Sequence, residues 1–230
     1  MKFAVIAYGP YREFDTAVKY WDFLNYLDCD VYVSTWSNSK QENSILNIKK
    51  EINVTEEMIL KYIPNAKIQI TDESKIKWVK WVTDKMIYHW KTGMKMVLDN
   101  DIKYDMVILM RLDTIYYFDE NRMKGQFHIN TIHGIGPLHE DGFINDTIFM
   151  GDPELMKDFI FQQRDVYNRD HYAIGEILKR YSYENLNILA GILRPNIVDL
   201  KEDDFIFEKI MVKFIEWNDG IVKNPYGFIG

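Results

Sequence analysis

The sequence predicts an α/β protein built on an open, mostly parallel sheet of the Rossmann type with helices on its faces. Two features of the chain lead to this fold class. Short, continuously apolar runs, typical of strands buried on both faces, alternate with longer segments whose apolar residues recur at helical spacing. That alternation favours parallel strands joined by right-handed crossovers. The most apolar run, residues 105–112, predicts a central strand.

The first half of the chain contains most of this alternation. An apolar run that ends at Gly9 and Pro10 predicts the first strand, and a segment of β-branched and aromatic residues predicts the second. Thr55 and two glutamates open a short helix that stops before Pro64, and the longest helical pattern precedes the central strand. In chain order we expect a strand at residues 2–7, a helix at 14–27, a strand at 30–36, a polar loop, the short helix, a strand at 66–70, a helix at 74–98 and the strand at 105–112.

The pattern changes after Asp119. Residues 120–145 are rich in Gly, His and Asn and have few periodic apolar positions, so we expect loops with short strands there. The chain has no internal repeat and no linker rich in Pro, Gly or Ser, which predicts a single domain over residues 1–230. The expected elements of the second half are a strand at 146–151, a helix at 153–163 with proline in its first turn, helical structure at 173–189 in one or two pieces, and a strand at 196–200.

Composition and charge exclude several classes of protein. The chain is 47% hydrophobic and 15% aromatic, which supplies a packed core and argues against disorder. A net charge of −7 argues against sequence-independent binding of nucleic acid, which requires a basic surface. The single Cys29 excludes an intrachain disulfide and a cysteine-based zinc site. No apolar stretch approaches the ~20 residues of a membrane span, so we expect a cytoplasmic protein without a transmembrane segment.

The end of the predicted central strand carries the clearest chemical signal. Arg111 and Asp113 follow an otherwise apolar run and, being two residues apart, share one face of a strand. Open α/β sheets bind ligands at the carboxyl ends of their strands. A carboxylate at such an end suits Mg²⁺ or Mn²⁺ bound to a diphosphate, and an arginine suits the phosphate oxygens. The alternative is a local ion pair that caps the strand.

The segment YDMVILMRLDTIYYF around this pair resembles a segment of bacterial and viral polysaccharide-biosynthesis proteins related to the GT-A glycosyltransferases. In this chain R-x-D stands in place of the D-x-D motif of those enzymes. Further resemblances occur in the same order along the chain, at AYGPYREFD, DVYVSTW, KMIYHWKTGMKMV, NDTIFMGDPELMKDF and the Glu176-Ile177-Leu178 step.

The resemblance implies a GT-A-like fold and transfer of a sugar from a nucleotide-diphosphate sugar to a hydroxyl of a glycan, lipid-linked or protein-linked acceptor. Residues 1–119 would then form the nucleotide-sugar-binding half and residues 120–230 the acceptor-side half. Asp113 would be the ligand of Mn²⁺ or Mg²⁺. Because Arg111 replaces the first carboxylate of D-x-D, the requirement for metal is in question, and Arg111 itself can neutralise diphosphate charge.

Further candidates for donor contacts lie at the ends of the first two predicted strands. Gly9 permits close backbone approach, and the guanidinium of Arg12 suits a phosphate or a base. The hydroxyl of Thr35 and the ring of Trp36 can line a nucleoside pocket. The alternatives are a surface turn and an ordinary core tryptophan. The expected donor-binding residues are Tyr8, Gly9, Arg12, Thr35, Trp36, Lys91, Arg111 and Asp113.

An inverting sugar transfer needs a carboxylate base for the acceptor proton. Asp141 lies in a loop rich in glycine and titratable residues, and Asp146 opens an apolar strand beside Asn145. We prefer Asp146, which also matches the N-D step of the resemblance, and a turn or strand-start aspartate is the alternative. Two other functions remain open at this point: nucleotidyl transfer on a similar sheet, and a non-catalytic module that binds a nucleotide sugar or a glycan.

Overall fold

The structure is a computed structural model of the 230-residue chain. It describes residues 1–12, 14–43, 48–77, 82–117, 123, 127–128, 130–135, 138, 147–163, 172–185 and 189–192. Within this part of the chain, no helix is long and apolar enough to span a bilayer.

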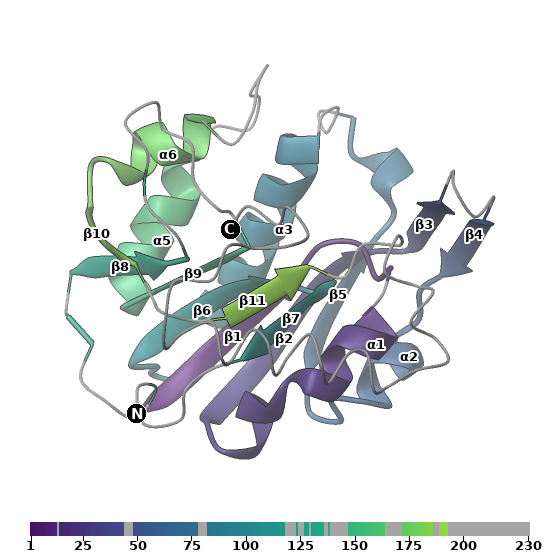
Figure 1. Cartoon of the computed structure of the whole chain (residues 1–230), viewed down its shortest axis with the longest axis horizontal. Helices are drawn as coiled ribbons and strands as arrows, with labels where there is room; N and C mark the ends of the chain where they lie inside the picture. Colours follow the sequence, from purple (N-terminus) through teal and green to yellow (C-terminus); the bar gives the residue numbers. More distant parts are fainter. Residues whose placement is uncertain are drawn as a thin grey trace, which may run out of the picture.

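A seven-stranded sheet forms the centre of the molecule (Figure 1). Its strand order is β10-β8-β9-β6-β1-β2-β5. Within this sheet β9 alone runs against its neighbours β6 and β8, and the other pairings are parallel. The strands are β1 (Lys2–Tyr8), β2 (Asp28–Trp36), β5 (Lys67–Thr71), β6 (Met106–Arg111), β8 (Thr131–Gly134), β9 (Ile148–Gly151) and β10 (Ser182–Asn185). The expected open, mostly parallel sheet with β6 at its centre is confirmed.

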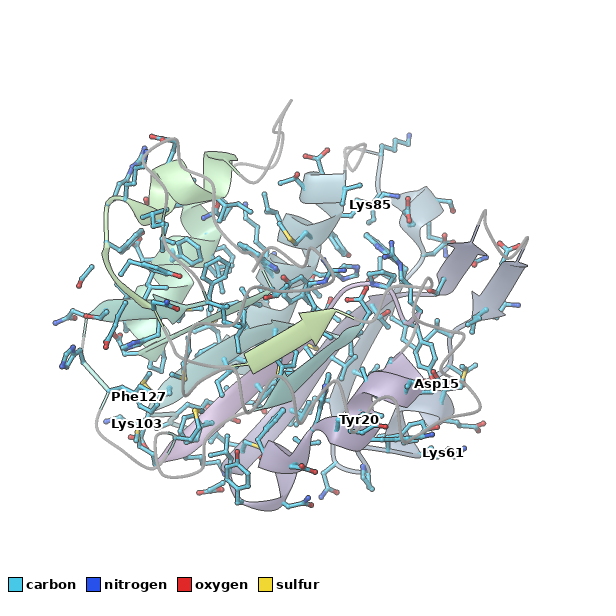
Figure 2. The ribbon with its side chains drawn as sticks, viewed as in Figure 1. Asp15, Tyr20, Lys61, Lys85, Lys103 and Phe127 are labelled. Atoms are coloured by element: carbon cyan, nitrogen blue, oxygen red, sulfur yellow. The ribbon has the colours of Figure 1, made fainter. Side chains whose placement is uncertain are left out.

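Helices cover both faces of this sheet and create two cores. Successive residues of β1 point to opposite faces: Phe3 and Val5 pack on the side of α1 and α2, and Ala4 and Ile6 on the side of α3, α5 and α6. Figure 2 shows Asp15 and Lys61 on the first of these sides. The helices are α1 (Phe14–Ala17), α2 (Glu56–Leu60), α3 (Val82–Leu98), α5 (Pro153–Gln162) and α6 (Tyr172–Leu178).

Two small antiparallel sheets accompany the large one. A hairpin of β3 (Asn38–Asn43) and β4 (Ile48–Asn53) follows the carboxyl end of β2, and β7 (Thr114–Tyr117) pairs with β11 (Leu189–Ile192). The sequence indicated a polar loop where β3 lies. That expectation is wrong because cross-strand pairing with β4 satisfies the backbone of this polar segment.

The helix expected at residues 14–27 is also wrong in its length. Helix α1 ends at Ala17, and two short 3-10 turns continue to Asn25. Trp21 lies between these turns with a non-helical backbone, and its indole Nε1 donates a hydrogen bond to the carbonyl oxygen of Thr114 at 2.9 Å. This buried tertiary bond and the packing of the Trp21 ring override the helical periodicity of the segment.

Two other helix predictions needed correction. In the segment 74–98 the described helix begins at Val82, after a 3-10 turn at Glu73–Lys75 that Asp72 caps through the amide of Ser74. In the segment 173–189, helix α6 ends at Leu178, and Ser182–Asn185 instead pairs with β8 as a strand. Long-range pairing at the sheet edge decided this second case. The strand expected at 196–200 lies outside the described residues.

Helix α3 approaches the sheet closely at Gly93. A β-carbon at this position would lie far inside van der Waals contact of Cγ2 of Ile6, a fully buried side chain of β1. Overpacking of this kind costs about 1–3 kcal/mol, and alanine gains roughly 1 kcal/mol over glycine in a helix. Because the clash is with a fully buried side chain, we expect a cost in the upper part of that range, so that Gly93→Ala lowers the free energy of unfolding by about 1–2 kcal/mol. Urea denaturation of both proteins tests this, and equal or higher stability of the variant would contradict it.

Candidate diphosphate site

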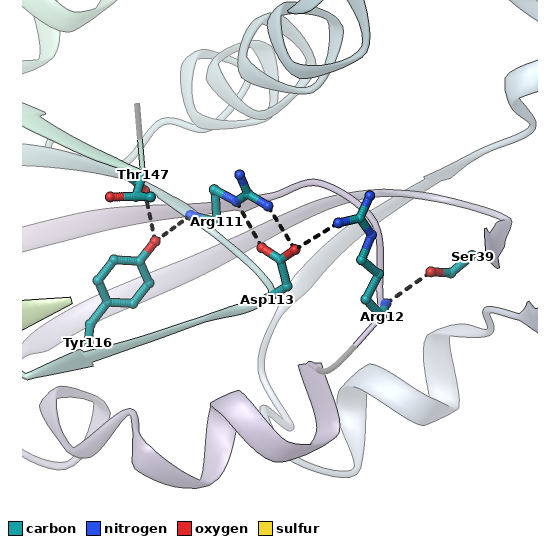
Figure 3. A network of polar contacts seen from close by, with 6 residues as sticks. All are labelled: Arg12, Ser39, Arg111, Asp113, Tyr116 and Thr147. Carbon is teal, nitrogen blue, oxygen red and sulfur yellow. Dashed lines mark hydrogen bonds and ion pairs between the residues drawn. The ribbon is translucent and has the colours of Figure 1, made fainter. Parts of the chain in front are cut away.

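A cluster of charged side chains lies at the carboxyl end of the central strands (Figure 3). Arg111 donates two hydrogen bonds to Asp113, from Nε to Oδ1 and from Nη2 to Oδ2, both at 2.8 Å. Nη1 of Arg12 lies 3.6 Å from the same Oδ2. The Asp113 side chain is 2% exposed, whereas those of Arg111 and Arg12 are 23% and 45% exposed. The carboxylate is therefore buried beneath two guanidinium groups.

The sheet register brings the two arginines together. Tyr8 is the last residue of β1 and pairs with Arg111, the last residue of β6. The carbonyl oxygen of Tyr8 accepts a hydrogen bond from the amide of Leu112 at 2.8 Å. The turn that follows β1 therefore emerges beside the turn that follows β6, and this places Arg12 next to Asp113.

The turn after β1 has an unusual backbone. Gly9 has φ 109°, which L-residues with side chains rarely adopt, and a β-carbon added there would meet no described atom within 4 Å. Arg12 has φ 27°, also in the left-handed region. Its amide donates a hydrogen bond to Oγ of Ser39, a buried residue of β3, at 2.9 Å. The β3–β4 hairpin thus holds Arg12 in a backbone conformation that is costly for a non-glycine residue.

Tyr116 supports the backbone beneath Arg111, a role that no sequence pattern indicates. Its hydroxyl accepts a hydrogen bond from the amide of Arg111 at 2.8 Å and donates one to the carbonyl oxygen of Thr147 at 2.7 Å. Burial raises the pKa of the Tyr116 phenol far above its ordinary value, so the hydroxyl keeps its proton. Tyr116 therefore joins the end of β6 to the segment that enters β9.

The described residues around Asp113 do not fit a resident divalent cation. Both carboxylate oxygens already accept N–H groups of Arg111, and a second guanidinium lies beside them. Among the residues that the structure describes, no group of three or more His, Cys, Asp or Glu side chains is arranged to hold a metal. Mg²⁺ and Mn²⁺ prefer several oxygen ligands, and the three described side chains Arg12, Arg111 and Asp113 offer one carboxylate beside two positive charges.

Thr35 and Trp36, expected to line a nucleoside pocket, lie at the carboxyl end of β2. Both are buried, and the Trp36 ring stacks on Tyr88 of α3 with centroids 5.2 Å apart. The His89 ring packs edge-on against the Trp36 ring, with ring centroids 4.1 Å apart. Nδ1 of His89 lies 2.8 Å from Oγ of Ser34. Burial lowers the pKa of His89 to about 3. The nucleoside role of Thr35 and Trp36 stays a prediction.

The structure describes one of the three remaining candidates, Lys91, and not the two aspartates. Lys91 is half-buried on α3, two residues beyond His89, and its role as a phosphate contact stays a prediction. The two candidate bases, Asp141 and Asp146, lie outside the described residues. Thr147, the chain neighbour of Asp146, accepts hydrogen bonds through its carbonyl oxygen from Tyr116 and from the Arg111 amide.

Comparisons with known proteins show distant structural likeness. No family model and no curated protein matches this chain. The structure of a galactosyltransferase, LgtC, in complex with donor and acceptor sugar analogues shares 10% identity over 80% of this chain and 73% of that one, with a TM-score of 0.48. The glycosyltransferase GlyE of Streptococcus pneumoniae matches at 11% identity over 81% of this chain and 46% of its own, with a TM-score of 0.44.

HddC from Yersinia pseudotuberculosis matches at 10% identity over 86% of this chain and 96% of its own, with a TM-score of 0.45. All three TM-scores lie below 0.5, so these likenesses do not by themselves assign an activity or a ligand to this chain.

Proposed function

We propose that this chain is a GT-A-like glycosyltransferase that transfers a sugar from a nucleotide-diphosphate sugar to a hydroxyl of a glycan or a lipid- or protein-linked acceptor. The donor binds to residues 1–119, and residues 120–230 form the acceptor side of a single domain. We further propose polysaccharide assembly as its setting.

One observation carries this proposal: two guanidinium groups, from Arg12 and Arg111, meet at the carboxyl end of the central parallel strands. This end of an open α/β sheet is where such folds bind ligands. Guanidinium groups match phosphate oxygens in charge and in the geometry of their donors. A diphosphate linked to a nucleoside is the ligand class that this edge suits, and the R-x-D segment resembles the corresponding segment of glycosyltransferases.

The transfer requires one bond to break and another to form. The bond between the anomeric carbon and the β-phosphate oxygen breaks, and the diphosphate leaves with the bonding electrons. The same carbon bonds to the acceptor oxygen, whose proton passes in an inverting transfer to a carboxylate; we propose Asp146, with Asp141 as the alternative. Negative charge that develops on the leaving diphosphate is stabilised by the guanidinium groups, which are already oriented.

A ligand screen tests this proposal. The protein is heated with each of a panel of UDP-, GDP- and dTDP-sugars, with and without Mn²⁺, and bound ligand stabilises the native state by mass action. At a concentration 100 times Kd we expect about 2.7 kcal/mol of stabilisation, or roughly 5–10 °C in Tm. The nucleoside monophosphate of the best ligand is the control and is expected to shift Tm less, because it lacks the second phosphate.

The stabilising nucleotide sugar is then incubated with candidate acceptors, and we expect release of the nucleoside diphosphate together with a glycosylated product. A chain that no member of the panel stabilises would contradict the proposed function. Stabilisation without release or transfer from any bound sugar would instead indicate a non-catalytic binding module.

A further inference from the structure

We propose that the two guanidinium groups of Arg12 and Arg111 neutralise the donor diphosphate in place of a divalent cation, and that Asp113 positions them. This inference rests on the proposed function and deepens it, because it replaces the expected metal at Asp113 with two fixed organic cations.

The distribution of charge in the cluster favours an anion. The charges of the three described side chains Arg12, Arg111 and Asp113 sum to one positive charge. The negative member, Asp113, is 2% exposed, whereas Arg12 is 45% exposed, so solvent and any ligand meet the positive members first. A diphosphate can approach this surface without displacing the carboxylate. A cation would have to approach a carboxylate whose two oxygens already accept N–H groups of Arg111, and the positive charge of both arginines opposes that approach.

Asp113 has the role of an internal counterion. Its bonds to Nε and Nη2 fix the plane of the Arg111 guanidinium, and its Oδ2 attracts Arg12 at 3.6 Å. Two guanidinium groups this close would otherwise repel each other, at a cost that the buried carboxylate offsets. The conformational entropy of orienting Arg111 is thereby lost during folding, before any ligand arrives.

Arg12 is the more adaptable partner. Its contact with Asp113 is longer than a hydrogen bond, and this is the single ion pair that its guanidinium makes among the described residues. Its backbone is nevertheless fixed by the bond from its amide to Ser39 and by its position in the turn after Gly9. An arginine with an anchored backbone and an exposed side chain can bind phosphate oxygens without loss of any described hydrogen bond.

Titration calorimetry with UDP, GDP and inorganic pyrophosphate tests the inference, first in excess EDTA and then in Mg²⁺ or Mn²⁺. We expect the affinity for the best nucleoside diphosphate to change by less than about tenfold between these conditions. We expect Arg12→Gln to lower that affinity about 10- to 100-fold in EDTA, since hydrogen bonds to charged groups contribute on this scale. Arg12→Lys is expected to recover part of the loss because it retains the charge.

Arg12→Gln and Arg12→Lys share the same backbone position, so a difference between them reports the guanidinium and its charge rather than the turn. Arg180→Gln replaces an exposed arginine after α6 and should leave affinity unchanged. Binding that EDTA abolishes and Mn²⁺ restores would overturn the inference and leave the proposed function standing. Unchanged affinity in Arg12→Gln would also overturn it. Absence of binding under every condition would overturn the inference and the proposed function together.

Discussion

Replacement of Arg111 by glutamine is expected to lower kcat/KM for sugar transfer by about 100- to 1,000-fold. The reason is that Arg111 offers a guanidinium oriented before the reaction, and removal of one such group from a site of developing charge has effects of this size. The measurement is the initial rate of transfer at subsaturating donor. Arg111→Lys keeps the charge but loses the bidentate geometry, so we expect an intermediate rate.

Arg111→Gln also leaves the buried Asp113 with a single, longer ion pair to Arg12. A loss of activity could therefore reflect a damaged fold, and the double variant Arg111→Gln with Asp113→Asn separates the two causes. It removes the buried charge, which Arg12 alone pairs at the longer distance, so we expect it to recover stability in urea denaturation but not activity. If the double variant regained both, or if Arg111→Gln retained the wild-type rate, Arg111 would have no direct role in transfer.

Acidification is expected to destabilise the protein through His89. Its pKa is about 3 in the folded state, because burial disfavours the charged ring, against about 6.5 in the unfolded chain. As pH falls below about 6.5 the unfolded state binds a proton that the folded state does not. Stability is therefore lost at roughly 1.4 kcal/mol per pH unit down to the folded pKa, about 2–3 kcal/mol between pH 6 and pH 4.

The comparison that isolates this effect is between the wild type and His89→Gln, with urea denaturation at a series of pH values. Carboxylates contribute equally to the pH dependence of stability in both proteins. The difference between the two plots of unfolding free energy against pH therefore reports the protonation of His89. We expect His89→Gln to be less stable than the wild type near neutral pH, because it loses packing against Trp36. The difference in free energy of unfolding between the two proteins is expected to narrow as pH falls. Ser34→Ala breaks the bond to Nδ1 but retains the ring, and its pH dependence should resemble the wild type. Parallel curves for the wild type and His89→Gln would contradict the prediction.

Part of the candidate site could be predicted from the sequence because strand geometry is local. Residues two apart on a strand share a face, which predicts that Arg111 and Asp113 lie together. They do lie together, although β6 ends at Arg111 and Asp113 lies in the turn that follows it. The alternative of an ion pair that caps the strand describes their contact correctly. The arrival of Arg12 beside them depends on the register between β1 and β6, which no short stretch of sequence encodes. Tyr116 was missed for the same reason, since its two partners come from the end of β6 and from Thr147.

The sequence by itself determined the alternation of strands and helices, the central position of β6 and the charged pair at its end. These features follow from hydrophobic periodicity, which depends on neighbours along the chain. The tertiary structure alone decided that Trp21 interrupts a helical pattern, that residues 182–185 join the sheet, and that Asp113 is covered by two arginines. Each of those outcomes depends on contacts between residues distant in sequence, whose free energies exceed the local propensities that they override.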